Sequence, residues 1–381
     1  MIPYGKQDIN QADINAVVDV LKSEFLTQGP IIEKFESAIE NYCRVENAIA
    51  TCNATAALHL SCLALGVEKN DIVWTSPVSF VASSNCAIYC GARIDFVDVE
   101  INTGLMCLDA LKKKLVHAKL SNQLPKVIIP VHLGGQSCDM QGIAKLAQEF
   151  GFKVIEDASH AIGARYQDKP VGNCQYSDIC VFSFHPVKII TTAEGGIATT
   201  NHPLLAKKIK MLSSHGVTRS QADMTEESHG SWYYQQIALG FNYRMSELHA
   251  ALGLSQLNRL DEFVNQRNLV AKRYTEKLAK LPLTHLKQYD ERYSSYHLFI
   301  IQLNNNKQHA QIFEQLKQAG IGVNIHYIPI HLQPYYKTLG FKAGDFPNAE
   351  KYYQQSITLP LHPNLTIIEQ DYIIHVLTNI F

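Results

Sequence analysis

The sequence predicts an α/β protein, with a mostly parallel central sheet in a large domain and a smaller α+β domain at the C-terminal end. Three observations support this fold class. From about residue 47 to residue 200, short apolar runs rich in β-branched residues alternate with segments of helical periodicity, as in strand–helix–strand units. After about residue 245 this alternation ends and a long helical tract begins. The length of 381 residues also exceeds the roughly 150 residues of an ordinary domain.

The first expected elements are two amphipathic helices at residues 13–24 and 30–43, where apolar residues recur at helical spacing. Pro30 suits the first turn of the second helix, because that position needs no backbone N–H donor. The alternating region follows. We expect its strands at residues 48–51, 72–77, 93–99, 126–135, 153–158, 178–184 and 195–200, and its helices at residues 54–65, 81–91 and 142–151.

The C-terminal part begins with the helical tract at residues 245–281, which we expect to bend near Gly253. The later segments are apolar runs at residues 297–303 and 322–329 and helices near residues 308–319 and 366–379. We assign residues 13–250 to the large domain, and residues 251–381, together with residues 1–12, to the small domain.

The composition excludes one broad class of protein. Hydrophobic residues make up 46% of the chain and charged residues 18%, below the typical charged share of about 25%, so there is ample material for a buried core. The chain has 34 Lys and Arg against 35 Asp and Glu, which gives a net charge of −1. This balance excludes a nucleic-acid binder that acts through bulk positive charge.

The cysteines and histidines predict neither a metal site nor a disulfide framework. The nine cysteines form no CxxC pair, and the sixteen histidines form no HExxH motif. Free thiols suit a reducing compartment. The opening residues, MIPYGKQDIN, contain no signal core, and no apolar run approaches about 18 residues. We therefore expect a cytoplasmic protein without a membrane span.

Two predicted strands end in residues that carry chemistry, and ligands of open α/β sheets bind at such ends. In CNATAAL (52–58) a helix begins after a strand, and its free N–H groups together with Thr55 can bind a phosphate. Taken alone, this segment reads more simply as a turn with Asn53 or Thr55 as the N-cap. In VIEDASH (154–160), Asp157 emerges at the sheet edge with His160 one helical turn later. A helix cap is an equally good interpretation of that carboxylate.

A third segment, VFSFHPVKIITTAEGG (181–196), holds a lysine among apolar residues. Burial lowers the pKa of a lysine and frees its amine as a nucleophile. Lys188 is therefore a candidate nucleophile, with Ser183 and His185 beside it, although a lone lysine is usually a solvated loop residue. The fourth segment, LGFNYRMSELHAALG (239–253), is a turn before a helix, and Ser246 can serve simply as its N-cap. No GxGxxG follows the first strand, which disfavours nicotinamide chemistry.

A lysine about thirty residues after an Asp–x–x–His suggests pyridoxal phosphate chemistry. The sequence closely resembles the DegT/DnrJ/EryC1 family of sugar aminotransferases, which has the fold of type I pyridoxal-phosphate enzymes. The motifs that carry the resemblance are NATAALHL, VIEDASHAIGA, FSFHPVKIITTAEGG and GFNYRMSELHAALGLSQL. The resemblance extends over nearly the whole chain, from IPYGKQDI to TLPLHP (358–363).

The resemblance implies that the cofactor is pyridoxal 5′-phosphate (PLP), or its amine form PMP, and assigns residues to it. Lys188 would form a Schiff base with the cofactor and then carry the proton, and Asp157 would pair with the pyridinium nitrogen. The remaining cofactor contacts implied by the resemblance are Phe80 stacked on the ring, His160 near its hydroxyl, and Thr55, Ala56 and Ser183 on the phosphate. Asn242 of a neighbouring subunit would complete the phosphate site, so a homodimer with shared active sites is expected.

Within the family, the opening IPYGKQDINQADINAVVDVLKSEFLTQGP and the segments VNIHYIPIHLQPYYKTLGF and GDFPNAEKYYQQSITLPLHP are similar to transaminases of pseudaminic acid biosynthesis. This similarity implies a UDP-linked 4-keto-6-deoxy-N-acetylhexosamine as amino acceptor and L-glutamate as donor. The residues expected toward the substrate are Tyr4, His185, Arg244, His326, Tyr327 and His331. Ordinary packing in the small domain is an equally good interpretation of His326, Tyr327 and His331.

Three alternatives stay open at this point. The acceptor can be another UDP- or dTDP-linked keto-sugar. The protein can be a 3-dehydratase, but such members of this fold carry a histidine where Lys188 stands. A non-catalytic regulatory protein of the same fold would have lost Lys188 or Asp157, and both are present.

Overall fold

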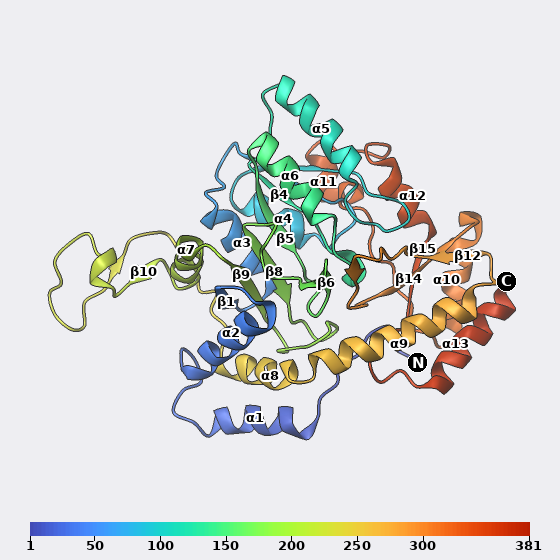
Figure 1. Cartoon of the computed structure of the whole chain (residues 1–381), viewed down its shortest axis with the longest axis horizontal. Coiled ribbons are helices and arrows are strands. Elements are labelled where there is room, and N and C mark those ends of the chain that lie inside the picture. The colour runs from blue at the N-terminus through green and yellow to red at the C-terminus, as the bar shows by residue number, and fades with distance from the viewer.

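A seven-stranded sheet forms the centre of the molecule in the computed structural model, which describes residues 1–381 (Figure 1). Its strands are β1 (Asn47–Thr51), β2 (Ile72–Thr75), β3 (Arg93–Phe96), β4 (Val127–Ile129), β5 (Lys153–Asp157), β8 (Ile179–Ser183) and β9 (Gly196–Thr200). Their order is β1-β9-β8-β5-β4-β2-β3. β9 is antiparallel to both of its neighbours, and the other four pairs are parallel. The predicted α/β fold with a mostly parallel sheet is thus confirmed.

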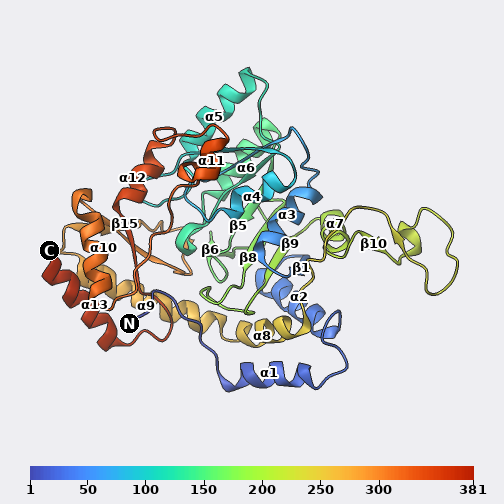
Figure 2. The same ribbon diagram turned by 180° about the vertical axis from the view of Figure 1, so that it is seen from behind.

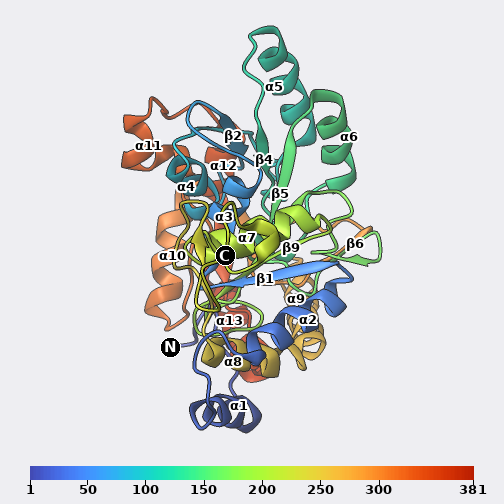
Figure 3. The same ribbon diagram turned by 90° about the vertical axis from the view of Figure 1, so that its left-hand side faces the viewer.

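Helices cover both faces of this sheet. They are α3 (Ala54–Ala64), α4 (Ala82–Tyr89), α5 (Leu108–Leu120), α6 (Met140–Phe150) and α7 (Pro203–Ser213). α3 packs across β5, β8 and β9, and α4 packs against β2 and β3. Figure 3 shows α5 and α6 on the opposite side of β4 and β5 from α4. Because the parallel strands all end at one edge, the loops that follow β5 and β8 lie next to the start of α3.

A second unit lies beside the sheet, in orange and red in Figures 1 and 2. Its elements are an antiparallel sheet of β12 (Leu283–His285), β14 (Phe299–Leu303) and β15 (Ser356–Leu359), with α9 (Leu260–Leu278), α10 (His309–Gln318) and α13 (Ile367–Ile380). The N-terminal residues join this unit, because the N–H of Gly322 donates a hydrogen bond of 2.7 Å to the carbonyl of Ile2. The predicted division at residue 250 stays a prediction. Within α9, Val264 packs into a hydrophobic core beside the seven-stranded sheet, whereas Val270 packs into the core of the second unit.

The helical tract at residues 245–281 departs from the prediction. It consists of two helices, α8 (Glu247–Leu257) and α9, and it breaks at Asn258 and Arg259 rather than bending near Gly253. Gly253 lies inside α8 for reasons of packing, because a Cβ there would lie 2.5 Å from Cγ2 of Thr192.

The sequence predicts some of the other segments correctly and misses others. The two N-terminal helices are confirmed as α1 (Gln11–Leu21) and α2 (Pro30–Cys43). Residues 322–329 form only an isolated bridge from Asn324 to Thr358, and β15 was not anticipated. The remaining short elements are β6 (Arg165–Tyr166), β7 (Lys169–Pro170), β13 (Arg292–Tyr293), α11 (Pro334–Thr338) and α12 (Pro347–Gln355).

An arm between α7 and α8 extends away from the body of the molecule (Figures 1 and 2). It contains the two-residue strands β10 (Val217–Thr218) and β11 (Gln235–Gln236). Trp232 and Leu239 on the arm are 72% and 82% exposed, which is unusual for large apolar side chains. None of the helices combines the length with the apolar character that crossing a membrane requires.

Candidate active site

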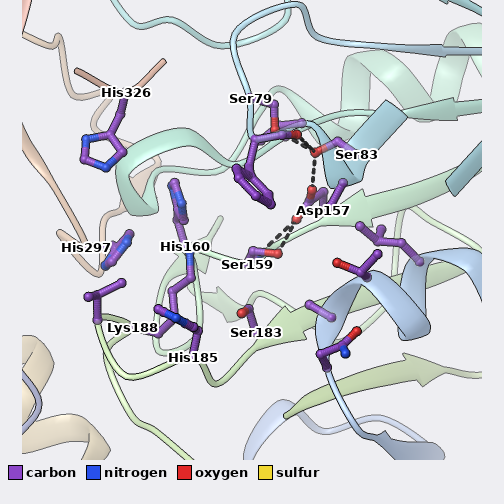
Figure 4. Close-up of a pocket in the computed structure, with 18 of the residues that line it drawn as sticks. Ser79, Ser83, Asp157, Ser159, His160, Ser183, His185, Lys188, His297 and His326 are labelled. Atoms are coloured by element: carbon purple, nitrogen blue, oxygen red, sulfur yellow. Dashed lines mark hydrogen bonds between the residues drawn. The ribbon is translucent and has the colours of Figure 1, made fainter. Parts of the chain in front are cut away.

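A pocket of about 550 Å³ lies where β5 and β8 end and α3 begins (Figure 4). Ten of the residues predicted from the sequence line it: Tyr4, Thr55, Phe80, Asp157, His160, Ser183, His185, Lys188, His326 and Tyr327. They come from the sheet edge, from the loops after the strands and from the second unit. The fold therefore brings together side chains that are up to 323 positions apart (4 to 327) in the sequence.

Lys188 reaches the pocket from a tight loop that follows β8. Its backbone N–H donates to the carbonyl of His185 at 2.9 Å, and the N–H of Thr192 closes the loop onto the carbonyl of Phe184 at 3.0 Å. Although part of the Lys188 residue is accessible, its amine is surrounded by protein, and this burial lowers the pKa of Lys188 to about 8. Only the charge of Asp157 acts in the opposite direction. The amine therefore loses its proton, and becomes nucleophilic, at a lower pH than an ordinary lysine.

Asp157 is the last residue of β5, and its carboxylate is only 4% exposed. Hydroxyl and amide groups surround it. Ser83 Oγ donates to Oδ2 at 2.6 Å, while Ser159 donates to Oδ1 through Oγ at 2.6 Å and through its backbone N–H at 3.1 Å. These three hydrogen bonds fix the orientation of the carboxylate. Asp157 can thus pair with a protonated ring nitrogen.

The start of α3 forms the end of the pocket that is suited to an anion. Asn53 is the N-cap, and its side chain accepts a hydrogen bond of 2.8 Å from the N–H of Ala56. Asn53 is one of the two residues that the sequence offers as N-cap. Gly196 fits closely against this turn, since a Cβ there would lie 2.4 Å from the backbone N of Ala54. Ala54, Thr55 and Gly195 consequently line the pocket at a helix N-terminus, where a phosphate is favoured.

Phe80 and His160 provide flat groups beside the pocket. Phe80 is 60% exposed, so its ring is free to stack on a ligand, and the ring of Tyr327 lies 6.4 Å away. His160 accepts the N–H of Gly134 on Nδ1 at 3.2 Å, so in the neutral ring its hydrogen is on Nε2, 3.1 Å from the Tyr327 hydroxyl. Burial, reinforced by Lys188, holds the pKa of His160 well below its ordinary value. His160 is therefore a neutral donor to Tyr327.

Residues of the second unit and the N-terminus form the opposite wall. The rings of Tyr4 and His326 are 5.4 Å apart, and Asn324 lies beside them. His326 Nδ1 is 2.8 Å from Thr358 Oγ1, and burial lowers the pKa of His326 to about 3. This wall consequently offers uncharged polar groups, of the kind that bind hydroxyls and amides.

Four predicted residues lie outside the pocket. Ala56 is buried in α3, and its N–H is already bonded to the N-cap. His331 lies outside the pocket, packed against Phe346, with its Nε2 3.0 Å from Glu350 Oε1. Asn242 is exposed on the body surface, and Arg244 donates to Ser214 Oγ at 3.0 Å. Neither of these last two reaches the pocket of its own chain.

Several pocket residues were missed from the sequence. They are Ser79, Ser83, Ser159, Glu194, His297 and Asn324. Asn53, Ala54 and Gly195 also line the pocket, whereas the sequence pattern indicates only a helix cap and a turn at these positions. Ser159 had a usable signal, because it stands within the DASH segment beside Asp157. The sequence gives no comparable signal for His297, which simply precedes an apolar strand. Its ring is 4.4 Å from the His160 ring, and burial holds its pKa well below the ordinary value.

The donor set of the pocket fits pyridoxal phosphate. Lys188 offers an amine for its aldehyde, Asp157 a carboxylate for its ring nitrogen, and Phe80 a face for its ring. At the far end, the N-terminus of α3, with Thr55 and Gly195 lining the pocket there, is suited to hold its phosphate.

Comparison with known proteins agrees with this fit. The sequence matches the DegT/DnrJ/EryC1/StrS aminotransferase family over residues 7–378. It is 37% identical over 378 residues to the UDP-4-amino-4,6-dideoxy-N-acetyl-beta-L-altrosamine transaminase of Campylobacter jejuni (strain 81-176), covering 98% of this chain and 96% of that protein.

Solved structures give the same picture. PseC of Helicobacter pylori, an aminotransferase of pseudoaminic acid biosynthesis, has a TM-score of 0.91 and 31% identity, covering 100% of this chain and 99% of that one. Spr1654 of Streptococcus pneumoniae, a candidate sugar aminotransferase, has a TM-score of 0.91 and 31% identity in its PMP form, with the same coverage. It has also been solved in a PLP form.

Proposed function

Because the chain belongs to the DegT/DnrJ/EryC1/StrS aminotransferase family, we propose that it transfers the amino group of L-glutamate to C4 of a UDP-linked 4-keto-6-deoxy-N-acetylhexosamine. The product would be UDP-4-amino-4,6-dideoxy-N-acetyl-β-L-altrosamine, which belongs to pseudaminic acid biosynthesis. The class does not depend on this substrate: the protein is a sugar aminotransferase that uses pyridoxal phosphate. The 37% identity to the Campylobacter jejuni transaminase named for that product supports the finer assignment.

The observation that carries the proposal is that the desolvated amine of Lys188 and the carboxylate of Asp157 lie in one pocket. When bound, pyridoxal phosphate withdraws electrons from the carbon that loses its proton. Asp157 holds the ring nitrogen in its protonated state. Phe80 would orient the ring. Ala54 and Thr55 at the start of α3, Gly195 before β9 and the Ser183 hydroxyl would hold the phosphate.

Lys188 then moves the protons. Its uncharged amine would take the proton from Cα of glutamate and deliver it to C4′ of the cofactor. In the second half of the cycle it would take a proton from C4′ and deliver it to C4 of the sugar. A base needs a pKa near the working pH, and burial brings the pKa of Lys188 to about 8. His160 keeps the Tyr327 hydroxyl in place by donating to it, which leaves the hydroxyl hydrogen of Tyr327 free to bond to a ligand.

The uncharged wall opposite the sheet supports a sugar as the acceptor. Tyr4, Asn324 and His326 can exchange hydrogen bonds with sugar hydroxyls and with an N-acetyl group, and His185 lies exposed at the rim. A different UDP- or dTDP-linked keto-sugar would meet the same kind of wall. This remains the second candidate within the same class.

A substrate comparison tests the proposal. The holoprotein would be incubated with L-glutamate and, in separate reactions, with UDP-4-keto-6-deoxy-N-acetylhexosamines and with UDP- and dTDP-keto-sugars that lack the N-acetyl group. We expect the highest kcat/KM for the N-acetylated UDP sugar, measured from 2-oxoglutarate release and from the mass of the amino sugar. Faster turnover of any other acceptor would contradict the substrate assignment and leave the class intact.

The lowered pKa of Lys188 predicts how the cofactor-free protein captures pyridoxal phosphate. Only the unprotonated amine attacks an aldehyde, and this form increases as the pH rises through about 8. The rate of covalent capture should therefore rise about tenfold per pH unit below pH 8 and level off above it. Stopped-flow absorbance across the pH range measures this rate. A rate that still rises beyond about pH 9 would indicate an ordinary lysine, whose pKa is about 10.4.

The arm and Asn242 support a homodimer with shared active sites. The exposed Trp232 and Leu239 of the arm would be covered by a second copy of the chain. Asn242 follows the arm and does not reach the pocket of its own chain. We propose that it completes the phosphate site of the partner.

Mixed dimers test this sharing. In a dimer of one Lys188→Ala chain and one Asn242→Asp chain, one of the two sites receives both Lys188 and Asn242 in wild-type form. We expect each homodimer to be nearly inactive and each mixed dimer to recover one site. The aspartate should be harmful because like charges at about 4 Å repel by roughly 4 kcal/mol at an effective dielectric of 20. Folded mixed dimers without recovered activity would place the action of Asn242 elsewhere.

A further inference from the structure

A chain of hydroxyl groups leads from the loop before α4 to Asp157 (Figure 4). Ser79 Oγ and Ser83 Oγ are 2.6 Å apart, and Ser83 Oγ is 2.6 Å from Asp157 Oδ2. All three residues are nearly inaccessible, at 4%, 1% and 4% exposure. They line the pocket and are almost fully buried, and a charge-assisted hydrogen bond is strong in such surroundings.

Counting hydrogens fixes the direction of this chain. The Ser83 hydroxyl has one hydrogen and three neighbouring oxygens: Asp157 Oδ2, Ser79 Oγ, and the carbonyl of Phe80 at 3.2 Å. A carboxylate can only accept, and a charge-assisted bond at 2.6 Å is stronger than a neutral one at 3.2 Å. Ser83 therefore donates to Asp157. The hydrogen between the two serines must then come from Ser79.

The two oxygens of Asp157 are held differently. Oδ1 accepts from Ser159 twice, through its hydroxyl and its backbone N–H, so the loss of the Ser159 side chain leaves one donor in place. Oδ2 accepts from Ser83 alone. The position of that oxygen consequently depends on one hydroxyl group at the start of α4.

We propose that Ser83 is a positioning residue for the amino-transfer reaction: it fixes Asp157 Oδ2 and stabilises the negative charge that keeps the proton on the cofactor ring nitrogen. Ser79 supports it from behind by donating to its oxygen. This inference rests on the proposed role of Asp157. Without Ser83, Oδ2 has no protein donor although Ser159 still holds Oδ1, and the unpaired Oδ2 competes better for the shared proton.

The neighbouring Ser84 provides a matched control. It lies in the same helix and is fully buried, at 0% exposure. Its hydroxyl is bonded to the Tyr336 hydroxyl and the Val81 carbonyl, and not to Asp157. Ser84→Ala therefore removes a buried serine hydroxyl from α4 without changing the hydrogen bonds of the carboxylate.

The experiment uses holoprotein loaded with cofactor labelled with ¹⁵N in the ring. In Ser83→Ala, the ring-nitrogen NMR signal should move toward that of an unprotonated pyridine, and kcat should fall about tenfold or more, as expected when a charged group loses one hydrogen bond. The KM values for both substrates should hardly change. Ser83→Thr should restore both readouts, and Ser84→Ala should move neither.

Ser83→Cys keeps the volume of the side chain but is a weak donor, so it gives the same test if the alanine variant does not fold. It should shift the nitrogen signal in the same direction. A wild-type nitrogen signal in folded, cofactor-loaded Ser83→Ala or Ser83→Cys would overturn the proposal. An equal shift in Ser84→Ala would also overturn it. If Asp157→Asn leaves the signal unchanged as well, it is the proposed role of Asp157 that fails rather than that of Ser83.

Discussion

Replacing Lys188 with alanine is expected to abolish amino transfer and to leave the fold intact. One side chain acts both as the nucleophile for the cofactor and as the carrier of the proton, and Lys188 is the only lysine that lines the pocket. Its loss should reduce kcat to the background level. Because burial already disfavours its charge, its removal should hardly change the free energy of unfolding. Turnover with glutamate and keto-sugar measures the first effect, and thermal unfolding the second.

Lys114 offers a control lysine. Burial also lowers its pKa, but it is paired with Asp95 at 2.7 Å and lies outside the pocket. The folded fraction of Lys114→Ala should therefore keep wild-type turnover. More than a trace of turnover in Lys188→Ala would contradict the assignment of the nucleophile.

Asp157→Asn is expected to lower kcat by about a hundredfold or more while changing cofactor affinity much less. An amide cannot stabilise a protonated ring nitrogen as a carboxylate does, and the electron sink is then lost. The amide also presents an NH₂ group near Ser83 and Ser159, which now donate to the carboxylate. Steady-state kinetics and a spectroscopic titration of the cofactor would separate the two effects.

Glu156 provides the matched control for this variant. It precedes Asp157 on β5 and is equally buried, but its carboxylate lies outside the pocket and is 2.7 Å from His132 Nε2. Glu156→Gln should weaken the fold and leave kcat of the folded protein unchanged. If Asp157→Asn kept near wild-type turnover, Asp157 could not have the proposed role.

The sequence was informative where local pattern and chain order determine the structure. Asp157 and Lys188 each follow a strand, and parallel strands end at one edge, so their meeting in one pocket was predictable. The mostly parallel sheet was predictable for the same reason. Local periodicity did not show where the helical tract breaks, because apolar residues continue at helical spacing on both sides of Asn258 and Arg259, and Asn is a weaker helix-stop signal than Gly or Pro.

The contacts that were missed depend on tertiary packing. His297 and Asn324 reach the pocket from the second unit, more than a hundred positions after Lys188, and no sequence period relates them to it. Ser83 meets Asp157 across 74 positions. The ring of His331 packs against Phe346, outside the pocket, and the sequence pattern does not show this placement. The role predicted for Asn242 concerns a neighbouring subunit, so a single chain leaves it as a prediction. The role predicted for Arg244 toward the substrate also stays a prediction.

The most direct test of the central claim is to identify the lysine that holds the cofactor. The holoprotein would be reduced with borohydride, which fixes the cofactor to its lysine, and then digested and analysed by mass spectrometry. Lys188 alone should carry the cofactor. A cofactor fixed to any other lysine, or to none in a protein that has bound it, would contradict the site described here.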